Sequence, residues 1–405
     1  MIDGIADQAP DAGAQPGARP WRQALLSGGY LWLAGHLLMA VATLFYAMPR
    51  GAPGESLDTW PAGASPGGLL ERWMWWDTGH YLAIAEHGYG PPIPSESTAF
   101  YPLYPLFVRA FDSVLPGDGF VAALVVSSIA AYVMLVLLHR LASYELGEAT
   151  AHRAGFYLVA FPFAFFLYIG YNESLFMAFA LGALYAMRKG QWWVAGVLGA
   201  FSSATRSAGV LLAMVLLFEY LRQRRFQPRA IRWDVLSVAL VPVGLACFSL
   251  YCKWKFDNAF AFSDAQNWWG RKLTLPWESV YSAVRTMNDV RVLHPQNLYN
   301  LVDVSFVLIA FAVLVLAVVG PWRLRADQFY LVVYGWASLG LAVLFPVSPP
   351  LALTSIPRYL LEIVAIFLVL AKMGQNRAFE RFYLMAAIGM QAIWMVLFLN
   401  HLWAG

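Results

Sequence analysis

The chain has 405 residues, of which 60% are hydrophobic and only 13% are charged, with a net charge of +3. Soluble globular proteins carry roughly 25% charged residues, so this chain has too little polar surface to cover a water-exposed fold. The mean hydropathy is +0.56, and the 17 Trp, 20 Tyr and 27 Phe are of the types that gather at membrane interfaces. The composition indicates a polytopic membrane protein and excludes soluble-enzyme, nucleic-acid-binding and disordered classes.

Residues 1–22 are rich in Ala, Gly, Pro and Asp and predict a disordered tail. The apolar run that follows, at 24–47, is long enough for a first membrane span. Further runs of spanning or near-spanning length lie at 120–139, 154–170, 172–187, 191–220, 233–256, 300–320, 328–346, 356–372 and 382–400.

The run at 191–220 is too long for one helix, and the polar stretch 202–207 interrupts it. It therefore predicts two short helices that meet at a buried break. We expect about eleven spans in one all-α transmembrane domain over residues 23–405.

Basic residues in the short loops predict the orientation, because Lys and Arg resist translocation. The strongest signal is the loop RQRRFQPRAIR at 222–232, and the other basic loops fall on the same side under the eleven-span count. The N-terminus is then cytoplasmic. The long connections at 48–119, 257–299 and 347–357 face the exterior, where we expect the chemistry.

The first exterior connection contains LLERWMWWDTGHYLAIAEHGYG at 69–90, whose apolar residues recur at helical spacing. This pattern predicts a helix that lies in the membrane interface. Asp77 is in its middle, beside Trp76, where partial desolvation would strengthen the carboxylate as a base. The alternative is that Asp77 caps a helix that begins after a break at Trp76.

The next segment, STAFYPLYPLFV at 97–108, has two prolines three residues apart. We expect Pro102 and Pro105 to forbid a regular helix start and to present Tyr101 and Tyr104 from a semi-extended backbone. Entry of an aromatic belt into the membrane is the alternative interpretation.

Polar residues inside apolar spans are costly, so each is a candidate for function. Asn172 and Glu173 lie near the exterior end of one span, Arg206 at the break in 191–220, and Arg358 at the start of another span. A guanidinium suits a lipid phosphate or pyrophosphate. Alternatively, Glu173 pairs internally with one arginine and leaves the other free.

No P-loop, GxGxxG, HExxH or GxSxG motif is present, and the seven histidines are scattered. We therefore expect no metal and no cofactor. Cys247 and Cys252 lie five residues apart in an apolar run, which is not a metal-ligand spacing.

WWDTGHYLAIAEHGY, FYPLYPL, FPFAFFLYIGYNESLF, ATRSAG and SIPRY follow one another between residues 73 and 360. This ordered set closely resembles the PIG-V type of GPI mannosyltransferase and its bacterial relatives. The resemblance implies a GT-C type helical bundle that performs inverting transfer, usually of mannose, from a polyprenyl-phosphate sugar on the exterior face, typically without a bound metal.

The resemblance also implies a role for Asp77 as the acidic residue of the first loop, and we expect it to be the general base. We expect Arg206 or Arg358 to hold the donor phosphate. The expected substrate-binding residues are Trp76, His80, Tyr81, Tyr101, Tyr104, Asn172, Glu173 and Tyr359.

The expected partners are a polyprenyl-phosphate-mannose donor, a glycolipid or glycan acceptor and the bilayer, with a small membrane subunit as a further candidate. The expected location is the bacterial inner membrane, or the endoplasmic reticulum in a eukaryotic host. A transporter or flippase of a lipid-linked sugar is the competing class, because intramembrane charges also line transport paths.

Overall fold

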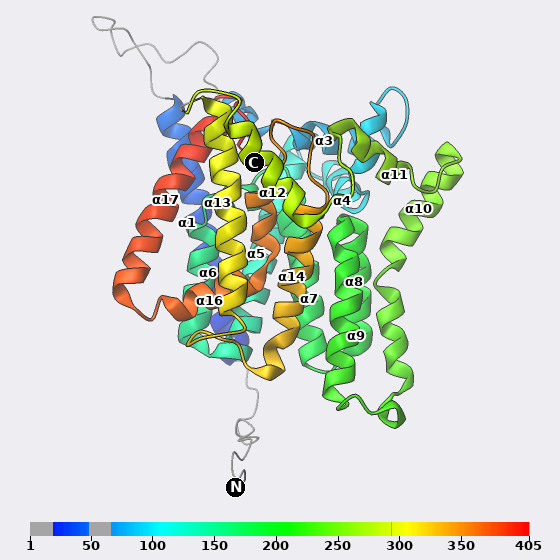
Figure 1. Cartoon of the computed structure of the whole chain (residues 1–405). Coiled ribbons are helices and arrows are strands. Elements are labelled where there is room, and N and C mark those ends of the chain that lie inside the picture. The colour runs from blue at the N-terminus through cyan, green and yellow to red at the C-terminus, as the bar shows by residue number, and fades with distance from the viewer. Residues whose placement is uncertain (1–18, 48–65, 293, 405) are drawn as a thin grey trace, which may run out of the picture.

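The computed structural model describes residues 19–47, 66–292 and 294–404, and these residues form helices and no strand. Figure 1 shows long helices running side by side, with the short helices α3, α4, α11 and α12 gathered at one end of the bundle. The helices of ten or more residues are α1 (Arg19–Ala47), α3 (Asp77–His87), α4 (Leu103–Asp112), α5 (Gly119–Leu146), α6 (Glu148–Ala160), α7 (Glu173–Arg188), α8 (Trp192–Thr205), α9 (Leu211–Gln223), α10 (Val243–Phe256), α12 (Pro276–Met287), α13 (Pro295–Leu316), α14 (Phe329–Leu344), α16 (Val364–Met373) and α17 (Arg377–Leu399).

The all-helical, multi-span prediction is confirmed, but the count of eleven spans is not. Among the described residues, five helices are long and apolar enough to cross a membrane, namely those containing α1, α5, α13, α14 and α17. A sixth span results if the 3₁₀ segment Trp233–Leu240 and α10, bent by 46°, are counted together. The other predicted runs fold into helices of 10–16 residues that are broken by turns. Helix α1 already begins at Arg19, and the rest of the predicted tail lies outside the described residues.

The predicted break inside 191–220 is confirmed. Helix α8 ends at Thr205, Arg206 is extended (φ −155°, ψ 150°), and α9 begins at Leu211 after a 3₁₀ turn. Because Arg206 lies between two helices, its charged side chain reaches the interior without disturbing the backbone hydrogen bonds inside either helix.

The predicted continuous helix at 69–90 is wrong. The alternative break at Trp76 is observed, but Trp76 and not Asp77 holds the cap position, and no side chain caps the helix there. A short helix, α2 (Pro66–Leu70), and a 3₁₀ turn at Glu71–Trp73 precede Trp76, which has a positive φ of 57°. Helix α3 then begins at Asp77. A helix that continued through Trp76 would require a negative φ there. The positive φ redirects the chain before α3 and so determines where the Asp77 side chain points.

The expected semi-extended backbone at Pro102 and Pro105 is also wrong, since α4 starts at Leu103. Proline is tolerated in a first helical turn, where the backbone N–H has no intrahelical partner. Helix α4 packs on α3 and α5 at the end of the bundle where the short helices gather.

Helix α7 is the most enclosed part of the bundle. From Glu173 to Met187, nearly every residue is buried, and α5, α8 and α9 pack around it. A helix that is apolar on all sides is expected in the centre of a bundle. Its two ends therefore carry charge into the interior, Glu173 at one and Arg188 at the other.

The end of α7 at Arg188 joins several basic loops through buried ion pairs. Arg188 lies 2.5 Å from Glu145 of α5, 2.8 Å from Glu219 of α9 and 3.1 Å from Asp327. Arg325 donates to the carbonyl of Glu145 at 2.9 Å. The short basic loops thus meet at one end of the bundle, and the longer connections meet at the other (Figure 1).

Replacing Arg188 by Met should lower the free energy of unfolding by about 3–5 kcal/mol, because Glu145 and Glu219 would remain buried without their shared cation. Thermal unfolding of the purified protein in detergent measures this change. Arg229→Met removes an exposed arginine from the loop after α9 and serves as the matched control. Equal stability of the two variants would contradict a structural role for the Arg188 cluster.

Candidate active site

Asp77 is the first residue of α3, and a buried tyrosine holds the bend before it. The Tyr171 hydroxyl accepts a hydrogen bond from the Asp77 N–H at 3.3 Å and donates to the Trp75 carbonyl at 3.2 Å. Tyr171 therefore gives the Asp77 N–H an acceptor at the start of the helix and adds a second donor to the Trp75 carbonyl, which also accepts from the Thr78 N–H at 3.4 Å. The sequence contains no spacing that identifies Tyr171 for this role.

The Asp77 carboxylate faces Arg358, which comes from the short helix α15 (Ile356–Tyr359). Arg358 Nη1 lies 2.9 Å from Asp77 Oδ2, and its Nε lies 3.3 Å from Glu173 Oε1. The guanidinium group is thus positioned between a carboxylate of the first loop and one at the start of α7.

Arg206 contacts the same glutamate from the α8–α9 break. Its Nη1 lies 2.8 Å from Glu173 Oε1 and 3.1 Å from Asn172 Oδ1, while its Nη2 lies 3.1 Å from Glu362 Oε1. Both arginines therefore pair with Glu173. The internal pairing of Glu173 that the alternative interpretation gave is observed, but with both arginines, so neither is left free.

The three carboxylates differ in exposure. The Glu173 and Glu362 side chains are 1% and 4% exposed, whereas the Asp77 side chain is 19% exposed. Asp77 is therefore the carboxylate of this cluster that a substrate hydroxyl can reach. Glu362 was not predicted, although it lies four residues after Arg358, one helical turn along the chain.

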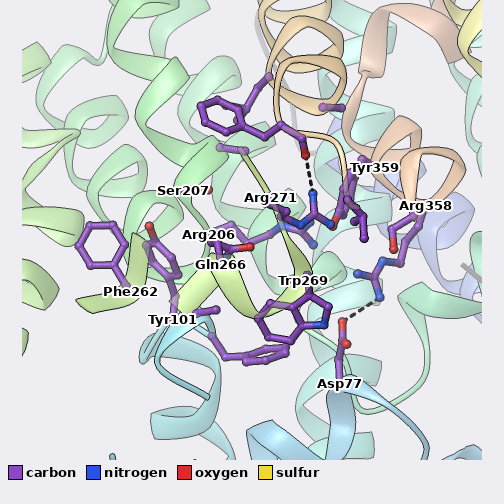
Figure 2. Close-up of a pocket in the computed structure, with 18 of the residues that line it drawn as sticks. Asp77, Tyr101, Arg206, Ser207, Phe262, Gln266, Trp269, Arg271, Arg358 and Tyr359 are labelled. Carbon is purple, nitrogen blue, oxygen red and sulfur yellow. Dashed lines mark hydrogen bonds and ion pairs between the residues drawn. The ribbon is translucent and has the colours of Figure 1, made fainter. Parts of the chain in front are cut away.

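These side chains line a cavity of about 650 Å³. Figure 2 shows the Asp77–Arg358 ion pair, and Trp269 and Arg271 of the second long connection line the same cavity. The lining residues that bear on the chemistry are Asp77, Tyr81, Tyr101, Asn172, Glu173, Arg206, Trp269, Arg271, Arg358, Tyr359 and Glu362.

Three other predicted residues lie outside the cavity lining. Tyr104 is fully buried, and its hydroxyl lies 2.8 Å from Ser127 Oγ. His80 bonds Ser97 Oγ at 2.8 Å and stacks on Phe100. Trp76 packs edge-on against Trp403. The cavity thus unites Tyr81, Tyr101, Asn172, Glu173 and Tyr359, and these three side chains make the contacts given above outside its lining.

Burial lowers the pKa of His80, and the negative charges of Asp77 and Glu96 oppose that shift only in part. His80 is therefore neutral at neutral pH. It adds no positive charge beside Asp77, so the cation that pairs with this carboxylate is Arg358.

A possible metal-binding group among the described residues is His139, Glu148 and His152, at the junction of α5 and α6. None of the three lines the cavity. At the cavity, the carboxylates of Asp77, Glu173 and Glu362 are paired with guanidinium groups.

Trp269 and Arg271 were missed because their segment carries no motif. Gly270 between them has φ +64°, and a Cβ there would overlap the Ser348 side chain. The Ser348 N–H donates to the Trp269 carbonyl at 3.1 Å, and the Thr274 N–H donates to the Leu344 carbonyl at 2.9 Å. Only the folded chain brings this segment against residues 344–348.

Comparison with known proteins gives consistent matches. Two curated relatives are GPI alpha-1,6-mannosyltransferase 2 of Mus musculus and of Homo sapiens, each 30% identical. The alignments cover 44% of this chain and 36% of the mouse protein, and 41% of this chain and 34% of the human protein. GPI mannosyltransferase 2 of Schizosaccharomyces pombe is 23% identical over 57% of this chain and 51% of its own length.

The chain thus matches about a third to a half of the length of these relatives. Among solved structures, the archaeal oligosaccharyltransferase AglB from Archaeoglobus fulgidus, in complex with an inhibitory peptide and a dolichol-phosphate, matches 91% of this chain and 55% of its own, with 13% identity and a TM-score of 0.36. A family model described as Mannosyltransferase (PIG-V) matches residues 64–333, a range that includes Asp77, Glu173 and Arg206. The chain therefore belongs to the PIG-V mannosyltransferase family.

Proposed function

We propose that this protein transfers mannose from a polyprenyl-phosphate-mannose donor to a hydroxyl of a lipid-linked or glycan acceptor, with inversion at the anomeric carbon. The observation that carries the proposal is the Asp77 carboxylate, held by Arg358 at the wall of a cavity that the acceptor can enter. Family membership and the names of the relatives support the sugar. The cavity lies at the end of the bundle away from the basic loops, which favours the periplasmic or lumenal face.

The proposed reaction is a single displacement. As the acceptor oxygen forms its bond to the anomeric carbon, Asp77 takes the acceptor proton. The bond from the anomeric carbon to the phosphate oxygen breaks, and its electron pair leaves with the polyprenyl phosphate. Asp77 suits the role of base because it is the exposed member of the carboxylate cluster.

Arg358 has a positioning role in this scheme. Its contacts with Asp77 and Glu173 fix the direction of the reactive carboxylate. Donor-phosphate binding by Arg206 or Arg358 stays a prediction, and it has a cost. Either arginine would have to leave a carboxylate partner in a buried environment, where an unpaired charge is strongly unfavourable.

Transport of a lipid-linked sugar is the alternative function. It requires the charges along the path to exchange partners as the substrate moves, whereas here Glu173 is held by two arginines from different segments. Family membership favours transfer. A reconstituted flux assay run beside the transfer assay separates the two functions.

Asp77→Asn should reduce mannose transfer by about 10²- to 10⁴-fold, because the amide keeps the shape but accepts no proton. Each variant is added to membranes that otherwise lack this protein. The assay then measures the labelled mannose that moves from polyprenyl-phosphate-mannose to the lipid and glycan fractions. Glu86→Gln, on the exposed face of the same helix, is the control and should keep wild-type transfer. Wild-type transfer by Asp77→Asn would show that Asp77 is not the base.

Arg358→Lys should lower kcat by about a hundredfold. A lysine cannot hold two carboxylates in the planar geometry of a guanidinium, so the Asp77 carboxylate would no longer be aligned with the acceptor proton. If Arg358 acts through Asp77 alone, the KM for the donor stays near the wild-type value. A rise in KM together with the fall in kcat would support phosphate binding by Arg358. Wild-type values of both constants would remove Arg358 from the mechanism.

A further inference from the structure

Three guanidinium groups surround one aromatic ring in the cavity. The central carbon atoms of Arg206, Arg271 and Arg358 lie 5.2, 5.9 and 5.4 Å from the Tyr359 ring centroid. Such cation–π contacts tolerate several cations near one ring but do not neutralise them. Only carboxylates can neutralise the positive charges of these arginines, and the three arginines do not have the same number of carboxylate partners.

Three carboxylates of the cavity, Asp77, Glu173 and Glu362, pair with Arg206 and Arg358, whereas a fourth, Asp264, accepts a hydrogen bond from Asn258 Nδ2 at 2.8 Å and forms no ion pair with Arg271. Glu173 contacts both arginines, Glu362 contacts Arg206, and Asp77 contacts Arg358. A ligand phosphate that approached either arginine would meet these negative charges at close range. Repulsion from the carboxylates opposes an anion at that position.

Arg271 has a different set of partners. Its Nη1 donates to the Phe345 carbonyl at 3.0 Å, and its Nη2 donates to the Tyr359 hydroxyl at 3.1 Å. Both acceptors are neutral, and no ion pair joins Arg271 to a carboxylate within the described part of the chain. A guanidinium carries five N–H donors, so three remain for a ligand.

Arg271 is also held in place before any ligand arrives. Gly270 adopts its left-handed conformation against Ser348, and backbone hydrogen bonds on both sides tie the segment to residues 344–348. The neighbouring Lys272 lines the same cavity and is exposed. A guanidinium that is already held in place suits an oxyanion, because little conformational freedom is lost on binding.

We propose that Arg271 binds the phosphate group of the polyprenyl-phosphate donor and of the departing polyprenyl phosphate, with Lys272 as a second cation. This proposal rests on the proposed function. Arg271 and Asp77 come from different connections and line the same cavity (Figure 2), so the phosphate and the base can contact different parts of one bound donor. The donor phosphodiester carries one negative charge and the leaving phosphate gains another, so Arg271 stabilises the departing group more strongly than the bound donor.

The experiment measures binding of two probes to the purified full-length protein in lipid nanodiscs. Polyprenyl phosphate without a sugar tests the phosphate contact, and polyprenol of the same chain length tests the lipid groove alone. The variants are Arg271→Ala and Arg271→Lys, with Arg285→Ala as the matched control. Arg285 lies in the same exterior connection, is exposed and does not line the cavity.

Arg271→Ala should weaken binding of polyprenyl phosphate by about tenfold or more and leave binding of polyprenol unchanged, since a charge-assisted hydrogen-bonding partner is lost. Arg271→Lys should fall between Arg271→Ala and wild type, and Arg285→Ala should match wild type. Transfer by Arg271→Ala should show a raised donor KM as well as a lower kcat.

Two results would overturn the proposal. Unchanged binding of polyprenyl phosphate by a folded Arg271→Ala protein would show that another group holds the phosphate. An equal loss for both probes would show that Arg271 only ties the exterior connection to residues 344–348. If the wild-type protein itself showed no preference for polyprenyl phosphate over polyprenol, the proposed donor class would fail instead.

Discussion

The site depends on Glu173, a buried carboxylate at the start of α7 that two arginines share. Arg206 reaches it from the break between α8 and α9, and Arg358 reaches it from the short helix α15. Removing three charges from water is costly, and the cost is offset only when every charge has a partner. Glu173 therefore joins three parts of the chain that are far apart in sequence, and through Arg358 it also fixes Asp77.

Each charged residue of this cluster lies where a helix starts, ends or breaks. Asp77 and Glu173 are the first residues of α3 and α7, where the helix dipole favours negative charge. Arg206 directly follows the last residue of α8, at the end that favours positive charge. The free backbone groups at these positions and the charged side chains share one polar region inside an apolar bundle, so the broken helices are part of how the site is built.

The sequence predicts this cluster in outline, because a charge inside an apolar run is rare and costly. Glu173, Arg206 and Arg358 were identified in that way, and a polar stretch marked the break at 202–207. Asp77 was identified instead by its place beside Trp76 in the first long connection and by the family resemblance. The cavity residues Arg271 and Glu362 were not identified. Arg271 lies in a polar connection where an arginine is unremarkable, and Glu362 was passed over beside Arg358. The count of eleven spans is not confirmed for a related reason, because helices broken by turns cannot be distinguished from full spans by composition.

The local errors share one cause. The backbone conformation at these positions depends on distant contacts and on the helix that a segment joins, and the local sequence pattern shows neither. The helical periodicity through Trp76 is present in the sequence, yet the helix breaks there. Tyr171, 94 residues after Asp77, accepts the hydrogen bond of the Asp77 N–H at the break. Likewise, Pro102 and Pro105 are compatible with a first helical turn, which proline content alone does not reveal. Tyr104 was an attractive sugar-facing residue by type, but the helix that begins at Leu103 directs it toward Ser127 in the interior.

Helix α7 has a consequence for how a lipid substrate reaches the cavity. Its 16 residues span about 24 Å, less than the roughly 30 Å thickness of a hydrocarbon layer, and charged clusters lie at both ends. At least one of those clusters then lies below the level of the lipid headgroups, shielded by the surrounding helices. If the cavity is at that end, the phosphate of a membrane-bound substrate must sink toward the bilayer interior to meet Asp77, while its isoprenoid tail stays in the layer it already occupies.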